Sequence, residues 1–153
     1  MEREEIKKIV WKAFTDFTGL EGNQNLNLEV YSWKRERFVR KLRELFPELR
    51  FRNSDGKVKV SDFVDALFAE SIHKDKMFAE ALQKAREVTK HPEYTLDSIP
   101  YEGRVHDVNY GLDEMKLATV LYKYFDYNPY FTTFENCKTL RDKCELLYRR
   151  GQF

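Results

Sequence analysis

The chain has 153 residues, a length that suits one compact domain or two small ones. Hydrophobic residues make up 42% and charged residues 35%, which is typical of a globular protein with a packed core. Because 27 Lys and Arg face 26 Asp and Glu, the overall charge indicates neither a nucleic-acid-binding nor a membrane-binding protein. No apolar run of about 18 residues occurs, and the N-terminus MEREEIKK lacks the apolar segment of a signal peptide, so we expect a cytoplasmic protein without membrane association.

The first half contains three segments with helical hydrophobic periodicity. Residues 2–17 place apolar side chains every three or four positions, and Gly19 follows as a typical helix end. After a polar connector, a second helix is predicted over 33–46, where Pro47 ends it. Beyond an extended loop, Ser61 is expected to cap a short third helix.

The second half has the same order of helices. Helices are predicted over 75–90 and 112–125, separated by a long connector. Thr139, followed three residues later by Asp142, resembles a capping box and predicts the start of the last helix. The charged segment AESIHKDK (69–76) is expected to connect the halves. We therefore expect an all-α fold with six helices.

The two halves can be aligned with each other. A shift of 79 residues places SWKRERFVRKLRELF (32–46) on GLDEMKLATVLYKYF (111–125), and their apolar positions coincide. With one more residue of shift, VSDFVDALF (60–68) lies on LRDKCELLY (140–148). The near-constant spacing from helix to loop to helix favours an internal duplication. We expect two small helical bundles in tandem, residues 1–74 and 75–153, packed together.

Each half carries a similar set of marker residues around its second and last helices. The second helix begins at Tyr31-Ser32-Trp33 in one half and at Tyr110-Gly111-Leu112 in the other, and it ends at Phe46 or Phe125. The last helix opens at Val60-Ser61-Asp62 or at Thr139-Leu140-Arg141-Asp142. This arrangement resembles the acyl-carrier-protein module, a four-helix bundle in which the serine of an Asp-Ser-Leu motif starts the second helix and carries phosphopantetheine.

The resemblance implies that Ser32 is the attachment position for phosphopantetheine, flanked by Trp33 and Phe38. A phosphodiester there would face unpaired backbone N–H groups and the positive end of the helix dipole. Gly111 has the equivalent position and no hydroxyl, so the second half cannot be modified there. The chain departs from the family in two ways, because Tyr31 replaces the aspartate and the second helix is basic instead of acidic. These departures favour a degenerate, non-enzymatic carrier that functions in protein–protein interaction.

The basic helix is the predicted partner-binding element. The segment 33–52 contains eight cations and three anions, and the residues expected to contact a protein partner are Trp33, Lys34, Arg37 and Lys41. In the simpler interpretation, Ser32 only caps the helix and the cations form its solvated face. Nucleic-acid binding by helix 33–43 is an alternative, although such a surface would favour interleaved aromatic residues and a basic domain.

A further alternative comes from the segment EVTKHPEYTLDSIPYEG (87–103). It is similar to a helix-end region of the immunity proteins that neutralise DNase colicins. That resemblance implies a toxin-neutralising module, which binds protein and has no enzymatic activity.

No catalytic or metal site is expected. The three histidines are widely spaced and have no partner at metal-ligand spacing: His73, His91 and His106. No nucleophile stands in a recognisable arrangement beside an acid or base. Cys137 and Cys144 are expected to be core thiols on the last helix.

Overall fold

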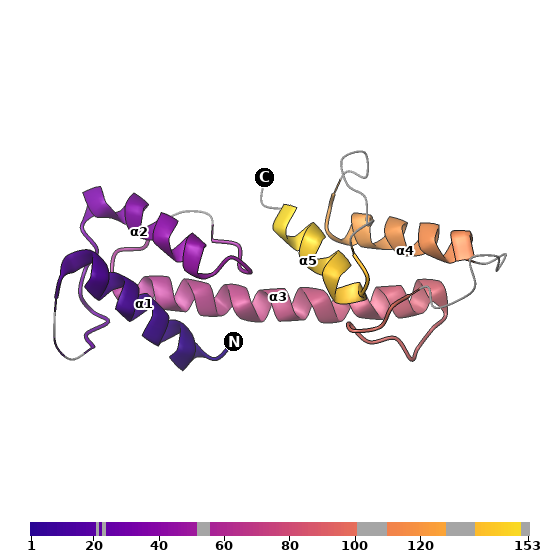
Figure 1. Cartoon of the computed structure of the whole chain (residues 1–153), viewed down its shortest axis with the longest axis horizontal. Helices are drawn as coiled ribbons and strands as arrows, with labels where there is room; N and C mark the ends of the chain where they lie inside the picture. The colour runs from indigo at the N-terminus through magenta and orange to yellow at the C-terminus, as the bar shows by residue number, and fades with distance from the viewer. Residues whose placement is uncertain (21, 23, 52–55, 101–109, 128–136, 151–153) are drawn as a thin grey trace. The chain divides into compact units, whose positions relative to one another are not determined.

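A computed structural model describes residues 1–20, 22, 24–51, 56–100, 110–127 and 137–150. The described residues form five α-helices (Figure 1): α1 (Arg3–Thr18), α2 (Ser32–Leu45), α3 (Val60–Thr89), α4 (Tyr110–Tyr124) and α5 (Leu140–Arg150). The predicted all-α fold class is confirmed. The chain divides into two compact units, Met1–Lys74 and Asp75–Phe153, which we call unit 1 and unit 2.

Helix α3 takes the place of two of the six predicted helices and of the connector between them. The segment 69–76 contains no glycine or proline, so no residue in it stops a helix. Two of its polar residues are also fixed by tertiary contacts, because Ser71 and Lys74 are buried and Lys74 Nζ donates a hydrogen bond of 2.9 Å to the carbonyl oxygen of Glu48. The prediction of a connector at 69–76 is therefore wrong.

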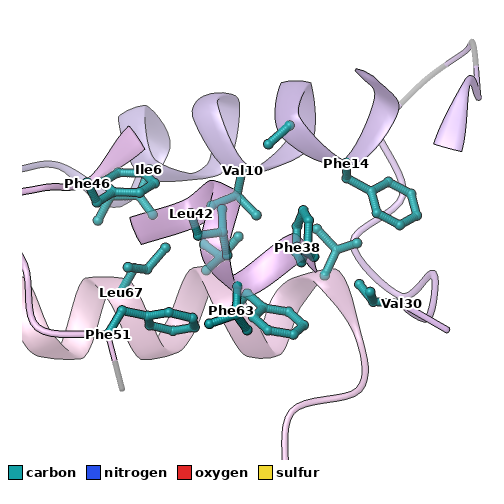
Figure 2. Close-up of a cluster of buried hydrophobic side chains, with 14 of the residues drawn as sticks. Ile6, Val10, Phe14, Val30, Phe38, Leu42, Phe46, Phe51, Phe63 and Leu67 are labelled. Atoms are coloured by element: carbon teal, nitrogen blue, oxygen red, sulfur yellow. The ribbon is translucent and has the colours of Figure 1, made fainter. Parts of the chain in front are cut away.

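Unit 1 packs α1, α2 and the first part of α3 around one hydrophobic core. Each helix contributes apolar side chains at helical spacing, and Figure 2 shows those of α1, α2 and α3 pointing toward one another. Phe38 of α2 lies at the centre, with its ring edge-on to Phe63 at 5.1 Å and to Phe14 at 6.2 Å between centroids. Edge-to-face pairs of this kind stabilise a core beyond the area that they bury.

The connector before α2 runs beside the start of α3. Three backbone hydrogen bonds join the two segments: Val30 N–H to the Val58 oxygen at 2.8 Å, Val60 N–H to the Leu28 oxygen at 2.9 Å, and Ser61 N–H to the Leu26 oxygen at 2.9 Å. An isolated antiparallel bridge between Glu29 and Lys59 belongs to the same contact. Residues 26–30, directly before α2, are therefore held against the start of α3.

Asp62 satisfies the backbone at the start of α3. Its carboxylate accepts the N–H groups of Val58 and Lys59, each at 2.9 Å. These hydrogen bonds, that of Lys59 first, hold the pKa of Asp62 below its ordinary value. Ser61 lies inside α3, so the prediction that Ser61 caps this helix is wrong.

Unit 2 packs the C-terminal part of α3 with α4 and α5 around a second core. Its buried residues are Phe78, Ala81, Ala85, Leu117, Leu121, Phe125, Leu140, Cys144, Leu147 and Tyr148. At the start of α5, Asp142 Oδ2 accepts the N–H of Thr139 at 3.2 Å, and Asp142 N–H donates to Thr139 Oγ1 at 3.1 Å. This reciprocal pair confirms the predicted capping box.

The two cysteines occupy different environments, and both are free thiols. Cys144 is buried in the core of unit 2, where desolvation raises the pKa of its thiol to about 12. Cys137 precedes α5 and is half-buried. The prediction that both lie on the last helix is therefore wrong for Cys137.

None of the helices within the described ranges has both the length and the apolar character needed to cross a lipid bilayer.

Candidate functional site

Ser32 is the first residue of α2, and its side chain is exposed. Tyr31 occupies the N-cap position with φ −55° and ψ 138°, and it makes no side-chain cap hydrogen bond. The interpretation of Ser32 as the helix cap is therefore wrong, because the cap is the preceding residue. The hydroxyl of Ser32 lies in the first turn, where backbone N–H groups point out of the helix end.

Two exposed aromatic rings stand on either side of Ser32. Tyr31 is 63% exposed and Trp33 is 73% exposed, and their rings stack at 6.4 Å with an interplanar angle of 14°. The Lys34 ammonium lies 4.7 Å from the Trp33 ring centroid and 5.6 Å from that of Phe17 on α1. Large exposed aromatic side chains next to a cation are the composition of protein-binding hot spots.

A groove of about 360 Å³ lies between α1 and α2. We call it the basic groove, and its lining residues are Ala13, Asp16, Phe17, Arg37, Arg40, Lys41 and Glu44. The guanidinium of Arg40 contacts Glu36 at 3.1 Å, and Lys41 contacts Glu44 at 3.7 Å. These pairs are exposed and therefore weak, so both cations can turn toward a partner at small cost.

The predicted partner-binding residues lie on one continuous surface. Arg37 and Lys41 line the basic groove, and Lys34 joins the aromatic pair to it through Phe17. Trp33 is the most exposed of the large hydrophobic residues described. Phe38 is fully buried, so the expectation that it flanks an attached group is wrong.

Sequence reasoning missed two members of this surface, Tyr31 and Phe17. In the sequence, Tyr31 stands out only as a departure from the carrier motif, and Phe17 has the helical spacing of a buried residue of α1. The position of Phe17 in the last turn of α1 was the available signal, since side chains at helix ends are less completely covered than those in the middle.

The histidines offer no metal site within the described part of the chain. The structure contains no group of three or more His, Cys, Asp or Glu residues there that could hold a metal ion. His91 Nδ1 lies 2.9 Å from Glu93 Oε1, and its ring stacks on Tyr94 at 4.8 Å. His106 lies outside the described residues.

Unit 2 repeats the contacts that hold the helix ends of unit 1. Asp142 accepts the N–H groups of Lys138 and Thr139, residues that stand 80 positions after the Val58 and Lys59 that Asp62 accepts. The connector contact also recurs, since Leu140 N–H donates to the Ser98 oxygen at 3.1 Å and Arg141 N–H to the Leu96 oxygen at 2.7 Å.

The two connectors lead to different residues at the start of the next helix. In unit 1 the helix is α2, and its first residue is Ser32. In unit 2 the helix is α4, and its second residue is Gly111. The hydroxyl of unit 1 therefore has no counterpart at the aligned position.

Comparison of the chain with protein-family models, with curated proteins and with solved structures finds no match. The assignment of a function therefore depends on the surface formed by α1 and α2 and on its chemistry.

Proposed function

We propose that the chain is a non-enzymatic, cytoplasmic binding protein made of two carrier-like helical modules, and that unit 1 binds an acidic protein partner. The partner contacts the exposed aromatic pair and the basic groove. The duplication is supported by the recurrence of the Asp62 and Asp142 contacts at a constant offset.

The main observation behind this proposal is that the exposed aromatic pair Tyr31–Trp33 and the basic groove form one continuous surface. The stacked Tyr31 and Trp33 rings supply a rigid, exposed apolar contact, and Lys34 joins them to the cations of the basic groove. An apolar anchor at one end of a charged groove suits a protein surface that presents one apolar pocket among carboxylates.

A protein partner fits this surface better than a nucleic acid. The basic groove also contains Asp16 and Glu44 beside its three cations, so it lacks the continuous positive surface that follows a nucleic-acid backbone. The two exposed rings stack on each other, whereas a nucleic-acid surface presents separate rings between which bases can stack. Toxin neutralisation is one specific case of protein binding, and it would require an acidic face on the toxin.

The test is capture of the partner with charge-reversed variants. The tagged full chain is incubated with extract of the native cells, and retained proteins are identified by mass spectrometry. Arg37→Glu combined with Lys41→Glu is expected to lose the partner. The matched control, Lys8→Glu combined with Lys12→Glu, changes the charge of unit 1 equally at exposed positions outside the groove, and it is expected to keep the partner.

Two further measurements separate the alternatives. Treatment of the extract with nucleases should leave the retained protein unchanged, and loss of retention would indicate nucleic-acid binding instead. Equal loss of the retained protein with the Arg37/Lys41 variant and with the Lys8/Lys12 control would mean that the net charge of unit 1, and not the groove, determines binding.

Attachment of phosphopantetheine to Ser32 is a second candidate, favoured by the exposure of this serine in the first turn of α2. The chain is incubated with coenzyme A and a promiscuous phosphopantetheinyl transferase, and its intact mass is measured. A carrier gains the mass of one phosphopantetheine group, and Ser32→Ala abolishes the gain. An unchanged mass for the wild type would exclude carriage and leave the binding proposal intact.

A further inference from the structure

Unit 2 has a groove of its own, of about 480 Å³, between the C-terminal part of α3 and α4. We call it the aliphatic groove, and its lining residues are Val88, Met115, Lys116, Thr119, Val120 and Lys123. At the shift of 79 residues that aligns α2 with α4, Arg37, Arg40 and Lys41 of the basic groove correspond to Lys116, Thr119 and Val120 here. The groove is thus in the equivalent place, but its floor is aliphatic.

The apolar part of this groove is open to solvent. Met115 is 68% exposed, an unusual exposure for a large apolar side chain on a helix. Its flexible thioether can adapt to a partner of varied shape. The Thr119 hydroxyl donates to the Met115 carbonyl oxygen at 2.7 Å, so it presents mainly its methyl group to an occupant.

Two lysines frame the apolar strip along α4. Lys116 and Lys123 are exposed and seven residues apart, which places them on one face about 10 Å apart along the helix axis. Within the part of the chain that the structure describes, neither ammonium has a carboxylate partner. The groove therefore presents an aliphatic centre with one positive charge at each end.

We propose that the aliphatic groove binds an amphipathic helix of a partner protein, one with an aliphatic stripe and two carboxylates seven residues apart. Proteins commonly bind an amphipathic helix of a partner in a groove between two of their own helices. The contacting side chains of the bound helix then recur every three, four or seven residues. Carboxylates at that spacing match Lys116 and Lys123, and the side chains between them cover Met115 and Val120. This inference concerns unit 2 and does not depend on the function proposed for unit 1.

The chemistry of the groove favours a helix over other occupants. A fatty acid has a single carboxylate and would leave one lysine without a counter-charge. A polar small molecule needs several converging hydrogen-bonding groups, whereas the centre of this groove offers aliphatic carbon.

The test uses a designed peptide probe and the full-length chain. The probe is a fluorescein-labelled helix with a leucine stripe and two glutamates seven residues apart, and fluorescence anisotropy measures its affinity. Lys116→Glu combined with Lys123→Glu is expected to weaken binding about tenfold, because two attractive contacts become repulsive. A probe with lysines in place of the glutamates should bind the reversed variant and restore the affinity.

Matched variants make the result specific to the groove. Lys76→Glu combined with Lys90→Glu changes two exposed lysines of unit 2 outside the groove and should leave binding unchanged. Met115→Asp should weaken binding of both probes without unfolding the chain, which circular dichroism verifies.

Two results with the probes would overturn the proposal: no affinity of the wild type for the glutamate probe, or equal affinity for the glutamate and lysine probes. Two other occupants would also overturn it. One is a long-chain fatty acid that binds tightly and displaces the probe, and the other is a second copy of the chain, in a dimer that Met115→Asp dissociates.

Discussion

The two units bury apolar residues at several aligned positions of their helices and differ in the residues that line their grooves. Phe38, Leu42 and Phe46 in unit 1 and Leu117, Leu121 and Phe125 in unit 2 are all buried at aligned positions. The grooves, by contrast, are lined differently: the basic groove of unit 1 by cations, and the aliphatic groove of unit 2 mainly by aliphatic side chains. The aligned buried positions therefore account for the similar cores, and the groove positions are where the two proposed binding surfaces differ.

One buried position shows how far the cores themselves can diverge. Phe63 of α3 is fully buried, and the aligned residue of α5 is Lys143, which is 4% exposed. Lys143 Nζ donates to the carbonyl oxygen of Cys137 at 3.0 Å, and desolvation lowers the pKa of this lysine. A charged residue is accepted at a core position of unit 2 because a backbone acceptor lies within reach.

The largest expected effect comes from truncating the aligned core residues. Phe38→Ala should reduce the free energy of unfolding by about 3–5 kcal/mol and Leu117→Ala by about 2–5 kcal/mol, since each leaves a cavity. Hydrogen exchange should rise mainly in α1 and α2 for the first variant and in α4 and α5 for the second. Trp33→Ala, at an exposed site, serves as control. Equal increases in both units for either variant would contradict the division into two cores.

An intermediate effect is expected where the units are joined within α3. His73→Pro should destabilise the chain by about 3 kcal/mol, because proline removes a helical hydrogen bond and clashes with the preceding turn. His73→Ala should be close to neutral, since His73 is exposed. Thermal unfolding measures both variants. A proline variant as stable as the alanine variant would mean that residues 69–76 form a connector.

A smaller, matched effect is expected from the two helix-start carboxylates. Asp62→Ala and Asp142→Ala should each cost about 1 kcal/mol near neutral pH, because each removes the acceptor of two backbone N–H groups. Backbone hydrogen bonds, those of Lys59 and Thr139 first, lower the pKa of each carboxyl below the ordinary 3.8. Their stabilisation is therefore complete above pH 3.8 and is lost as the pH falls through the lower folded pKa.

The check is chemical denaturation of the wild type and both variants at a series of pH values. The variants should be less stable at neutral pH and should approach the wild type in acid. A constant difference at every pH would show that these carboxylates do not contribute through their charge.

Periodicity was sufficient to predict the helices themselves, because each buries one face at spacings of three and four residues. It failed at residues 69–76, where a charged segment suggested a break. The segment contains no glycine or proline that would stop a helix, and Lys74 is further fixed by its hydrogen bond to the carbonyl oxygen of Glu48, 26 residues away in sequence.

The candidate site was predicted in part. Charge clustering identified Arg37 and Lys41, and both line the groove. The stacking of Tyr31 on Trp33 could not be predicted, because it depends on the φ and ψ of the N-cap residue. Helical periodicity predicts that Met115 is buried in helix 112–125, and this prediction is wrong because the side chain is 68% exposed. The aliphatic groove was missed for this reason.

The most direct test of two different binding surfaces is photo-crosslinking from aligned positions in the grooves. A photoreactive amino acid replaces Arg40 in the basic groove or Thr119 in the aliphatic groove, with Lys8 as the control position. After irradiation in extract of the native cells, the crosslinked proteins are identified by mass spectrometry. We predict a crosslink to an acidic protein surface at Arg40 and to an acidic amphipathic helix at Thr119, each located by mapping the crosslinked peptides. No product above that at Lys8, or a crosslink at Thr119 to a partner segment that is not helical, would contradict the account.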